Sequence, residues 1–252
     1  MISKLITRLH AYRFDWKLSL LTAVLLPLMI SLGFWQLRRG DEKDAIQRVF
    51  DLRVRERPVN LAELETDTDL QYKQVALVGH FDNAHVFLLD NRVYQGRPGF
   101  EVIVPFVTSD ERVVMVNRGW VAMGPSRTEL PQITAIEGEQ HLRGAVYQAV
   151  GQAVTLGTLQ ESQTWPRVIE TLDVTEMAAM AGVSARNVFP HSVRLGEGET
   201  GVLIRYWPVI SMSPEKHRGY AVQWFAMSLA LLLLYLYYST KPQQHSDASE
   251  DI

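Results

Sequence analysis

Two long stretches without Asp, Glu, Lys, Arg or His, one near each end of the sequence, restrict this chain more than any other feature. They are residues 18–37 and residues 220–238. At 1.5 Å per residue, a helix of about 20 residues spans about 30 Å, which is the thickness of the hydrocarbon core of a bilayer. Tryptophan, tyrosine and arginine residues lie at the ends of the stretches, as they do at membrane interfaces. We therefore predict two transmembrane helices.

The first stretch is predicted to be a retained anchor. It is too long for the apolar region of a signal peptide, and FWQLRR follows it where a cleavage site would have small residues. No Arg- and Ser-rich transit peptide precedes it, which favours a bacterial protein. The alternative, two buried helices of a soluble protein, is disfavoured because soluble helices of this length carry a polar face. Two crossings place both termini on one side of the membrane, but charge does not decide which side, because a long loop is exempt from the positive-inside rule.

The segment between the anchors, residues 38–219, is predicted to be one mainly β domain. Short β-branched segments bounded by turn residues predict its strands. A helix is expected to continue out of the first anchor over residues 41–55, and a short helix with an Asp173 cap over residues 174–181. The fold class is therefore membrane-anchored α+β, in which two transmembrane helices flank a barrel-like or sandwich domain. Residues 1–17 precede the first helix, and residues 239–252 follow the second. The predicted strands are residues 74–81, 86–91, 100–108, 112–116, 141–148, 188–195 and 202–209.

Composition excludes several kinds of site. The absence of cysteine excludes disulfides, thiolate metal sites and a cysteine nucleophile, and the net charge of −3 gives no reason to expect a nucleic-acid partner. The glycines at 196, 198 and 201 form a G-x-G-x-x-G pattern, but a strand-like segment follows where a dinucleotide site needs a helix. His80, Asp82 and His85 resemble metal ligands by spacing, yet they lie between two predicted strands and are better explained as turn residues.

Polar and aromatic residues gather where each predicted anchor meets the domain. Because both anchors join the same domain, these two clusters lie at the same depth. A histidine with aromatic walls and nearby guanidinium groups has the composition of a haem pocket, although interfacial anchoring alone explains the same residue types. We expect the histidine to be exposed at the membrane boundary. The candidate cofactor-binding residues are Trp35, Arg38, His217, Arg218, Tyr220 and Trp224.

These same residues carry a family resemblance. LGFWQLRRGDEKDAI (residues 32–46), VNRGWV (116–121) and SPEKHRGYAVQWF (213–225) resemble the three signatures of the Surfeit-locus family of cytochrome c oxidase assembly factors. Residues 72–106 are similar too, so the likeness extends over nearly the whole chain. The sequence departs at Ser213, where the family usually has Asn, but serine also caps helices well.

The resemblance implies a bacterial inner-membrane protein whose main domain lies in the periplasm, with residues 1–17 and a disordered tail, 239–252, in the cytoplasm. It implies a chaperone role without catalysis: helping haem a to reach subunit I of the oxidase, with haem a synthase as a further partner besides membrane lipid. The family's proposed haem-contacting histidine falls on His217, which would ligate the haem iron transiently. Trp35, Trp224 and Tyr220 would then cover the macrocycle, and Arg38 or Arg218 would meet the propionates.

Two other functions were weighed. A membrane sensor or binding domain without haem would need an output module, which the 14 residues after Tyr238 are too short to provide. A haem-modifying enzyme would need a metal or redox centre, for which cysteine is absent and histidine is sparse. The NRGW segment at residues 117–120 is predicted to support structure, with glycine at a turn or bulge, more than to contact ligand.

Overall fold

The computed structural model describes residues 15–64, 68–126, 129–149 and 164–240. The chain forms two compact units, a helical unit of residues 1–48 with 209–252 and a β unit of residues 49–208. Most of the predicted N-terminal segment (1–17) and of the predicted tail (239–252) lies outside the described residues.

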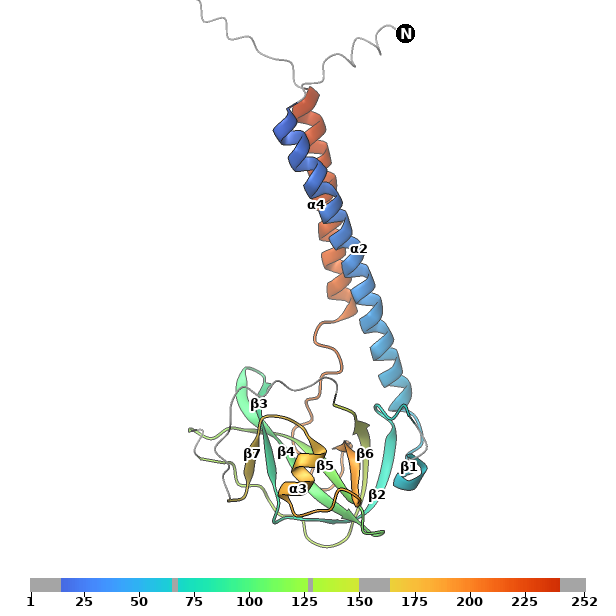
Figure 1. Cartoon of the computed structure of the whole chain (residues 1–252), viewed down its shortest axis with the longest axis vertical. Helices are drawn as coiled ribbons and strands as arrows, with labels where there is room; N and C mark the ends of the chain where they lie inside the picture. Colours follow the sequence, from blue (N-terminus) through green and yellow to red (C-terminus); the bar gives the residue numbers. More distant parts are fainter. Residues whose placement is uncertain (1–14, 65–67, 127–128, 150–163, 241–252) are drawn as a thin grey trace, which may run out of the picture. The chain divides into compact units, whose positions relative to one another are not determined.

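The helical unit consists of two long helices that run antiparallel, α2 (Trp16–Arg53) and α4 (Pro214–Thr240) (Figure 1). The prediction that the first helix continues beyond the apolar stretch is confirmed, because α2 is unbroken to Arg53. Both helices are long and apolar enough to cross a membrane, and only 11% of the most apolar window of each is buried. Exposed leucines and valines cover their outer faces, whereas the core helix of a soluble protein would bury them.

The two helices meet along a seam of small and polar residues. On α4 the buried residues begin with Pro214, His217 and Ala221 and recur at Ser228, in steps of three, four and seven. This is the period of a packed helix pair, and small side chains at the seam let the backbones approach closely. Ser19 Oγ lies 2.9 Å from the Tyr235 hydroxyl at one end of the seam. Lipid tails are as apolar as the helix surfaces, so apolar burial does not favour contact between helices over contact with lipid. Polar contacts such as this one therefore stabilise the pair.

The β unit is built on a sheet of eight strands in the order β1-β2-β6-β8-β5-β4-β3-β7. A further antiparallel pairing of β2 with β4 closes five of them, β2-β6-β8-β5-β4, into a barrel. The prediction of a barrel-like domain is thus confirmed. The strands are β1 (Val59–Asn60), β2 (Gln74–Phe81), β3 (Phe87–Tyr94), β4 (Arg97–Thr108), β5 (Val113–Ala122), β6 (Gln140–Tyr147), β7 (Arg167–Ile169) and β8 (Val188–Leu195), with a 3₁₀ turn, η1 (Leu61–Leu64), and one short helix, α3 (Val174–Met180).

The barrel closes at Gly79, where β2 changes partner. This residue pairs with Gln140 of β6 on one side and with Thr108 of β4 on the other. A Cβ atom at Gly79 would lie 2.0 Å from the carbonyl oxygen of Val107. Only a residue without a side chain allows the two strands to come this close, so barrel closure depends on this glycine.

Two hydrophobic cores stabilise the β unit. The larger fills the barrel and includes Phe81, Phe100, Phe106 and Leu142. The smaller lies under α3, where Met177 packs with residues such as Phe87, Ile103 and Met115. The α3 helix begins as predicted, because Asp173 accepts hydrogen bonds from the backbone N–H groups of Thr175 and Glu176.

Six of the seven predicted strands are present, and two of them, at 74–81 and 188–195, have the predicted bounds. The seventh, at residues 202–209, is wrong. In that segment Ile204 makes a single antiparallel bridge to Trp120, and no ladder follows. The strands β1 and β7 were not predicted, because two or three residues carry no alternating pattern. The predicted turn after β2 is confirmed, since Asp82 accepts a hydrogen bond from the backbone of Ala84.

The NRGW segment forms a β-bulge within β5 and not a turn. Val102 and Ile103 of β4 face Gly119 and Asn117, so Arg118 is the extra residue. Gly119 has φ +118°, and the Asn117 side chain accepts a hydrogen bond from its backbone N–H. Arg118 is 3% exposed and donates to the carbonyl groups of Thr134 and Gly201. The prediction that this segment supports structure agrees with these contacts.

We expect Gly119→Ala to destabilise the β unit more than a substitution at an open glycine. A positive φ costs a residue with a side chain about 1 kcal/mol or more, and a Cβ at Gly119 would lie 2.7 Å from the Ile204 carbonyl oxygen. The free energy of unfolding should fall by more than about 2 kcal/mol, measured by urea unfolding of the full chain with tryptophan fluorescence. Gly138→Ala is the control, because Gly138 has φ +76° and no atom within 4 Å of its Cβ position. Equal losses for the two variants would contradict the role of the bulge.

Candidate functional site

The sequence-predicted site residues all belong to the helical unit, and His217 lies at their centre. Its side chain is buried between the helices, with the residue 7% exposed. The expectation of an exposed boundary histidine is therefore wrong. The reason is that Gly40 of α2 faces it: a Cβ at Gly40 would lie 3.4 Å from the Cβ of His217 and 3.4 Å from the carbonyl oxygen of Pro214. A Cβ at these distances is in ordinary van der Waals contact, so α4 packs against a position of α2 that accepts only a small side chain.

A hydrogen bond fixes the orientation of the His217 ring. Nδ1 lies 2.7 Å from Oε1 of Gln36 on α2. An amide oxygen can only accept, so in the neutral imidazole Nδ1 carries the proton and Nε2 keeps its lone pair. A histidine that binds a metal is commonly oriented in this way by a partner on its other nitrogen. Gln36 lies near the predicted cluster but was not predicted as a site residue, because the sequence does not show that it faces His217.

The two candidate arginines have different surroundings. Arg218 forms an ion pair with Asp44 and lies 3.8 Å from a carboxylate oxygen of Asp41. Arg38 is exposed, and within the described residues it forms no ion pair or hydrogen bond. Arg218 therefore ties the two helices together, whereas the guanidinium of Arg38 is available to an external anion.

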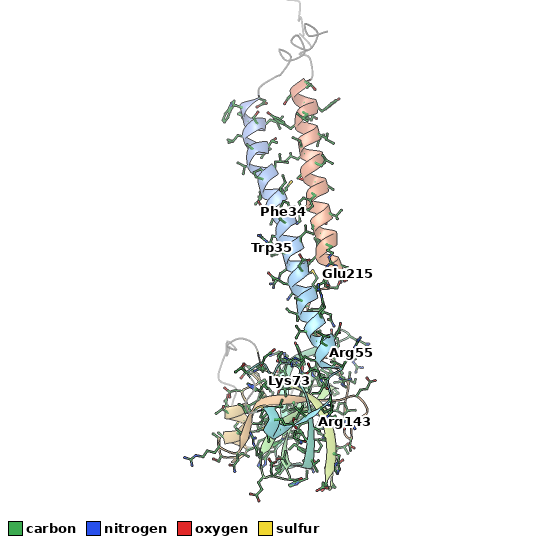
Figure 2. The ribbon with its side chains drawn as sticks, turned by 90° about the vertical axis from the view of Figure 1, so that its right-hand side faces the viewer. Phe34, Trp35, Arg55, Lys73, Arg143 and Glu215 are labelled. Carbon is green, nitrogen blue, oxygen red and sulfur yellow. The ribbon has the colours of Figure 1, made fainter. Side chains whose placement is uncertain are left out.

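The candidate aromatic residues lie around the helix pair and not within its seam. Trp35, labelled in Figure 2, is 49% exposed. Tyr220 is 47% exposed, while Trp224 is half-buried. Beside them, the ring of Phe225 meets the edge of Phe34 at a centroid distance of 5.3 Å. The aromatic side chains are therefore more exposed than the buried His217, and they face the surroundings of the helix pair.

The pairing of the helices can be tested directly because the chain has no cysteine. We expect the double variant Gly40→Cys with His217→Cys to form a disulfide, since the Cβ separation of 3.4 Å is close to the usual range of about 3.5–4.5 Å. The crosslink is measured by the change in gel mobility of the oxidised, unreduced full chain after cleavage at a protease site inserted after Ser109, an exposed turn residue. Gly40→Cys with Glu215→Cys is the control, because Glu215 is exposed. Crosslinking of both pairs to the same extent would contradict the described seam.

Comparison with known proteins agrees with the resemblance seen in the motifs. Residues 23–229 match the SURF1 family. A SURF1-like protein of Rickettsia felis is 25% identical over 228 residues, covering 88% of this chain and 96% of its own length. One from Dictyostelium discoideum is 27% identical and covers 85% and 93%. The cytochrome oxidase assembly protein SHY1 of Saccharomyces cerevisiae is 27% identical over 160 residues, 60% of this chain and 40% of that protein. Because the family match covers most of the chain and includes both helices, this chain belongs to the SURF1 family.

Proposed function

We propose that this chain is an assembly factor for cytochrome c oxidase, anchored in a bacterial inner membrane by α2 and α4. The observation that carries the proposal is the family match over residues 23–229. The relative SHY1, whose name states a role in oxidase assembly, supports it. The exposed apolar faces of both helices support membrane anchoring, because lipid is the solvent in which such faces are stable.

The β unit is proposed to lie in the periplasm, with both termini in the cytoplasm. Antiparallel α2 and α4 require that both ends of the chain lie on one side of the membrane. A chain without cysteine suits either side of the membrane, so the choice of the periplasm follows from the family resemblance.

The cargo is proposed to be haem a, on its way to subunit I of the oxidase, and haem a synthase is the proposed donor. Nε2 of His217 has the chemistry of an axial ligand, because Gln36 holds the proton on Nδ1. A single histidine holds haem iron less firmly than a receiving subunit that offers two, so transfer in that direction is favoured. Burial of the ring means that the cargo must reach it from beside the seam or after the helices separate locally.

The neighbouring side chains support the same proposal. Trp35, Tyr220 and Trp224 would cover the flat faces of the macrocycle. Arg38 is a better propionate partner than Arg218, because Arg218 is already paired with Asp44. An arginine at headgroup depth keeps its charge at low cost. No step of this function requires the chain to make or break a covalent bond.

The orientation is tested with two reporter fusions. We expect a reporter that is active only in the periplasm to be active when it is inserted after Ser109 and inactive when it follows Lys241. Activity of whole cells, corrected for the amount of fusion protein, measures the difference. The reverse pattern would contradict the periplasmic position of the β unit.

The role of His217 is tested with two variants that differ in what they remove. His217→Gln removes the ligand but keeps a polar side chain of similar size, so we expect loss of the haem Soret band from protein purified out of a haem a-producing membrane. Gln36→Leu keeps the imidazole and removes its partner, so we expect haem retention to weaken by about 10- to 100-fold. The haem a content of the oxidase should fall most with His217→Gln and less with Gln36→Leu.

The control is His141→Ala, because His141 lies on β6 in the β unit with a side chain 75% exposed. Its Soret band and oxidase haem content should match those of the wild type. Each variant is compared at equal abundance by immunoblot. An unchanged Soret band in a stable His217→Gln protein would exclude His217 as the ligand and leave the assembly role without this mechanism.

A further inference from the structure

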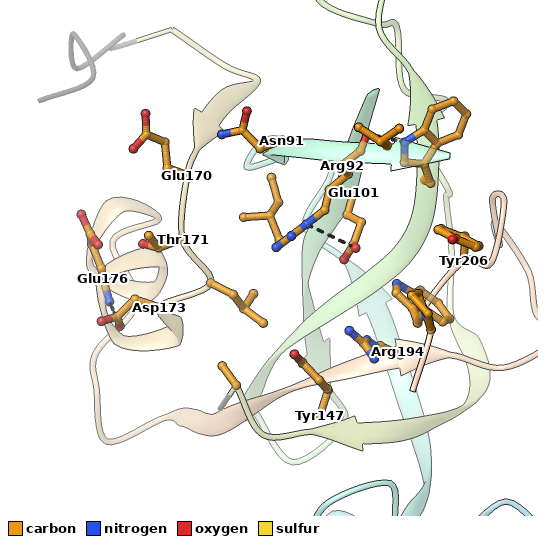
Figure 3. Close-up of a pocket in the computed structure, with 17 residues that line it drawn as sticks. Asn91, Arg92, Glu101, Tyr147, Glu170, Thr171, Asp173, Glu176, Arg194 and Tyr206 are labelled. Atoms are coloured by element: carbon orange, nitrogen blue, oxygen red, sulfur yellow. Dashed lines mark hydrogen bonds and ion pairs between the residues drawn. The ribbon is translucent and has the colours of Figure 1, made fainter. Parts of the chain in front are cut away.

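The β unit contains a cavity of about 870 Å³ that the proposed haem site does not use. The cavity is lined by residues of several strands, by the start of α3 and by the segment after β8 (Figure 3). That segment, residues 206–208, belongs to the predicted strand that is absent. Cavities of about 300–1,000 Å³ are the size of small-molecule sites.

Arg194 of β8 is the most unusual residue of this cavity. Its guanidinium carbon lies 3.5 Å from the ring centroid of Tyr147 and 5.3 Å from that of Trp207. Its Nε is buried, and among the described residues nothing accepts a hydrogen bond from it. The indole N–H of Trp207 is buried and lacks an acceptor in the same way. Two adjacent buried donors without an acceptor are costly, so the structure has to provide a reason for them.

The other charges of the cavity leave Arg194 without a counter-ion. Arg92 Nε lies 3.4 Å from Glu101, whose carboxylate also accepts from Asn117 at 2.5 Å. Glu101 is therefore already engaged. Burial lowers the pKa of the Arg194 guanidinium from its ordinary value, while Tyr147 and Glu101 partly oppose this effect. The residue nevertheless remains charged at neutral pH, because arginine in proteins is not deprotonated.

Apart from Glu101, the acidic residues of the cavity lie on its opposite side. Figure 3 shows Asp173 and Glu176 at α3 and Glu170 just after β7, all away from Arg194 and Tyr147. Asp173 is committed to capping α3. A ligand with negative charge at both ends would meet repulsion at the α3 side. The cavity therefore selects for one anionic group at one end of the ligand.

We propose that this cavity binds a small organic ligand that carries one carboxylate on a flat aromatic or conjugated body. The carboxylate accepts hydrogen bonds from the terminal N–H groups of the Arg194 guanidinium, because its Nε and the indole N–H of Trp207 are too deeply buried for a ligand atom to contact. A planar guanidinium matches a carboxylate with two parallel hydrogen bonds. The flat body stacks against the aromatic side chains that line this side, Tyr147, Tyr206 and Trp120. This site does not depend on the proposed role in oxidase assembly.

The test uses the full chain in nanodiscs and two matched probes, 2-naphthoate and its uncharged analogue 2-naphthamide. Calorimetric titration should show saturable binding of 2-naphthoate at concentrations below about 1 mM and binding of 2-naphthamide at least about tenfold weaker. Arg194→Met should weaken 2-naphthoate by at least about tenfold. Arg194→Lys, which keeps the charge but not the two parallel donors, should weaken it by a smaller factor. Empty nanodiscs give the correction for partition into lipid.

Arg143→Gln is the control, because Arg143 lies exposed on β6 outside the cavity lining, and it should bind 2-naphthoate as the wild type does. Removal of an unpaired buried charge does not destabilise the fold. We therefore expect the melting temperature of Arg194→Met to be at or above that of the wild type, which would show that weaker binding does not result from unfolding. The proposal is overturned if wild type does not bind 2-naphthoate saturably, if both probes bind equally, or if Arg194→Met and Arg194→Lys bind as the wild type does.

Discussion

The close approach of α4 to α2 at Gly40 determines what His217 can do. With a small residue at position 40, the helices pack closely enough for Gln36 to reach the imidazole. The hydrogen bond then selects one tautomer, and the selected tautomer leaves Nε2 free to act as a ligand. A residue larger than alanine at position 40 would separate the helices, and the histidine would lose its burial and its orientation together.

A similar dependence on backbone contact governs the β unit. Gly79 allows β4 to meet β2 and close the barrel, while the bulge at Gly119 brings the β5 backbone against Ile204. The contact with Ile204 holds the segment after β8 next to β5. This segment supplies Trp207 to the cavity. The barrel and its cavity are therefore consequences of the same close contacts.

The sequence predicted the elements better than the contacts between them. The two apolar stretches, the barrel-like domain and the strands at 74–81 and 188–195 follow from local periodicity, which one sequence displays. The segment 202–209 has the composition of a strand but forms only a single β-bridge, at Ile204, and composition does not reveal a strand partner. The burial of His217 depends on Gly40, 177 positions away in the sequence, so no local pattern could predict it.

Arg118 and Arg194 differ in whether their N–H donors have acceptors within the fold. Arg118 is buried, but the carbonyl groups of Thr134 and Gly201 accept its N–H donors, so its charge stabilises the bulge. Arg194 lies among aromatic rings, and within the described residues no acceptor meets its buried Nε. The two residues have the same chemistry and similar positions in adjacent strands. Of these two residues, Arg194 alone has a buried N–H donor without an acceptor among the described residues, and the proposed external carboxylate would pair with its guanidinium.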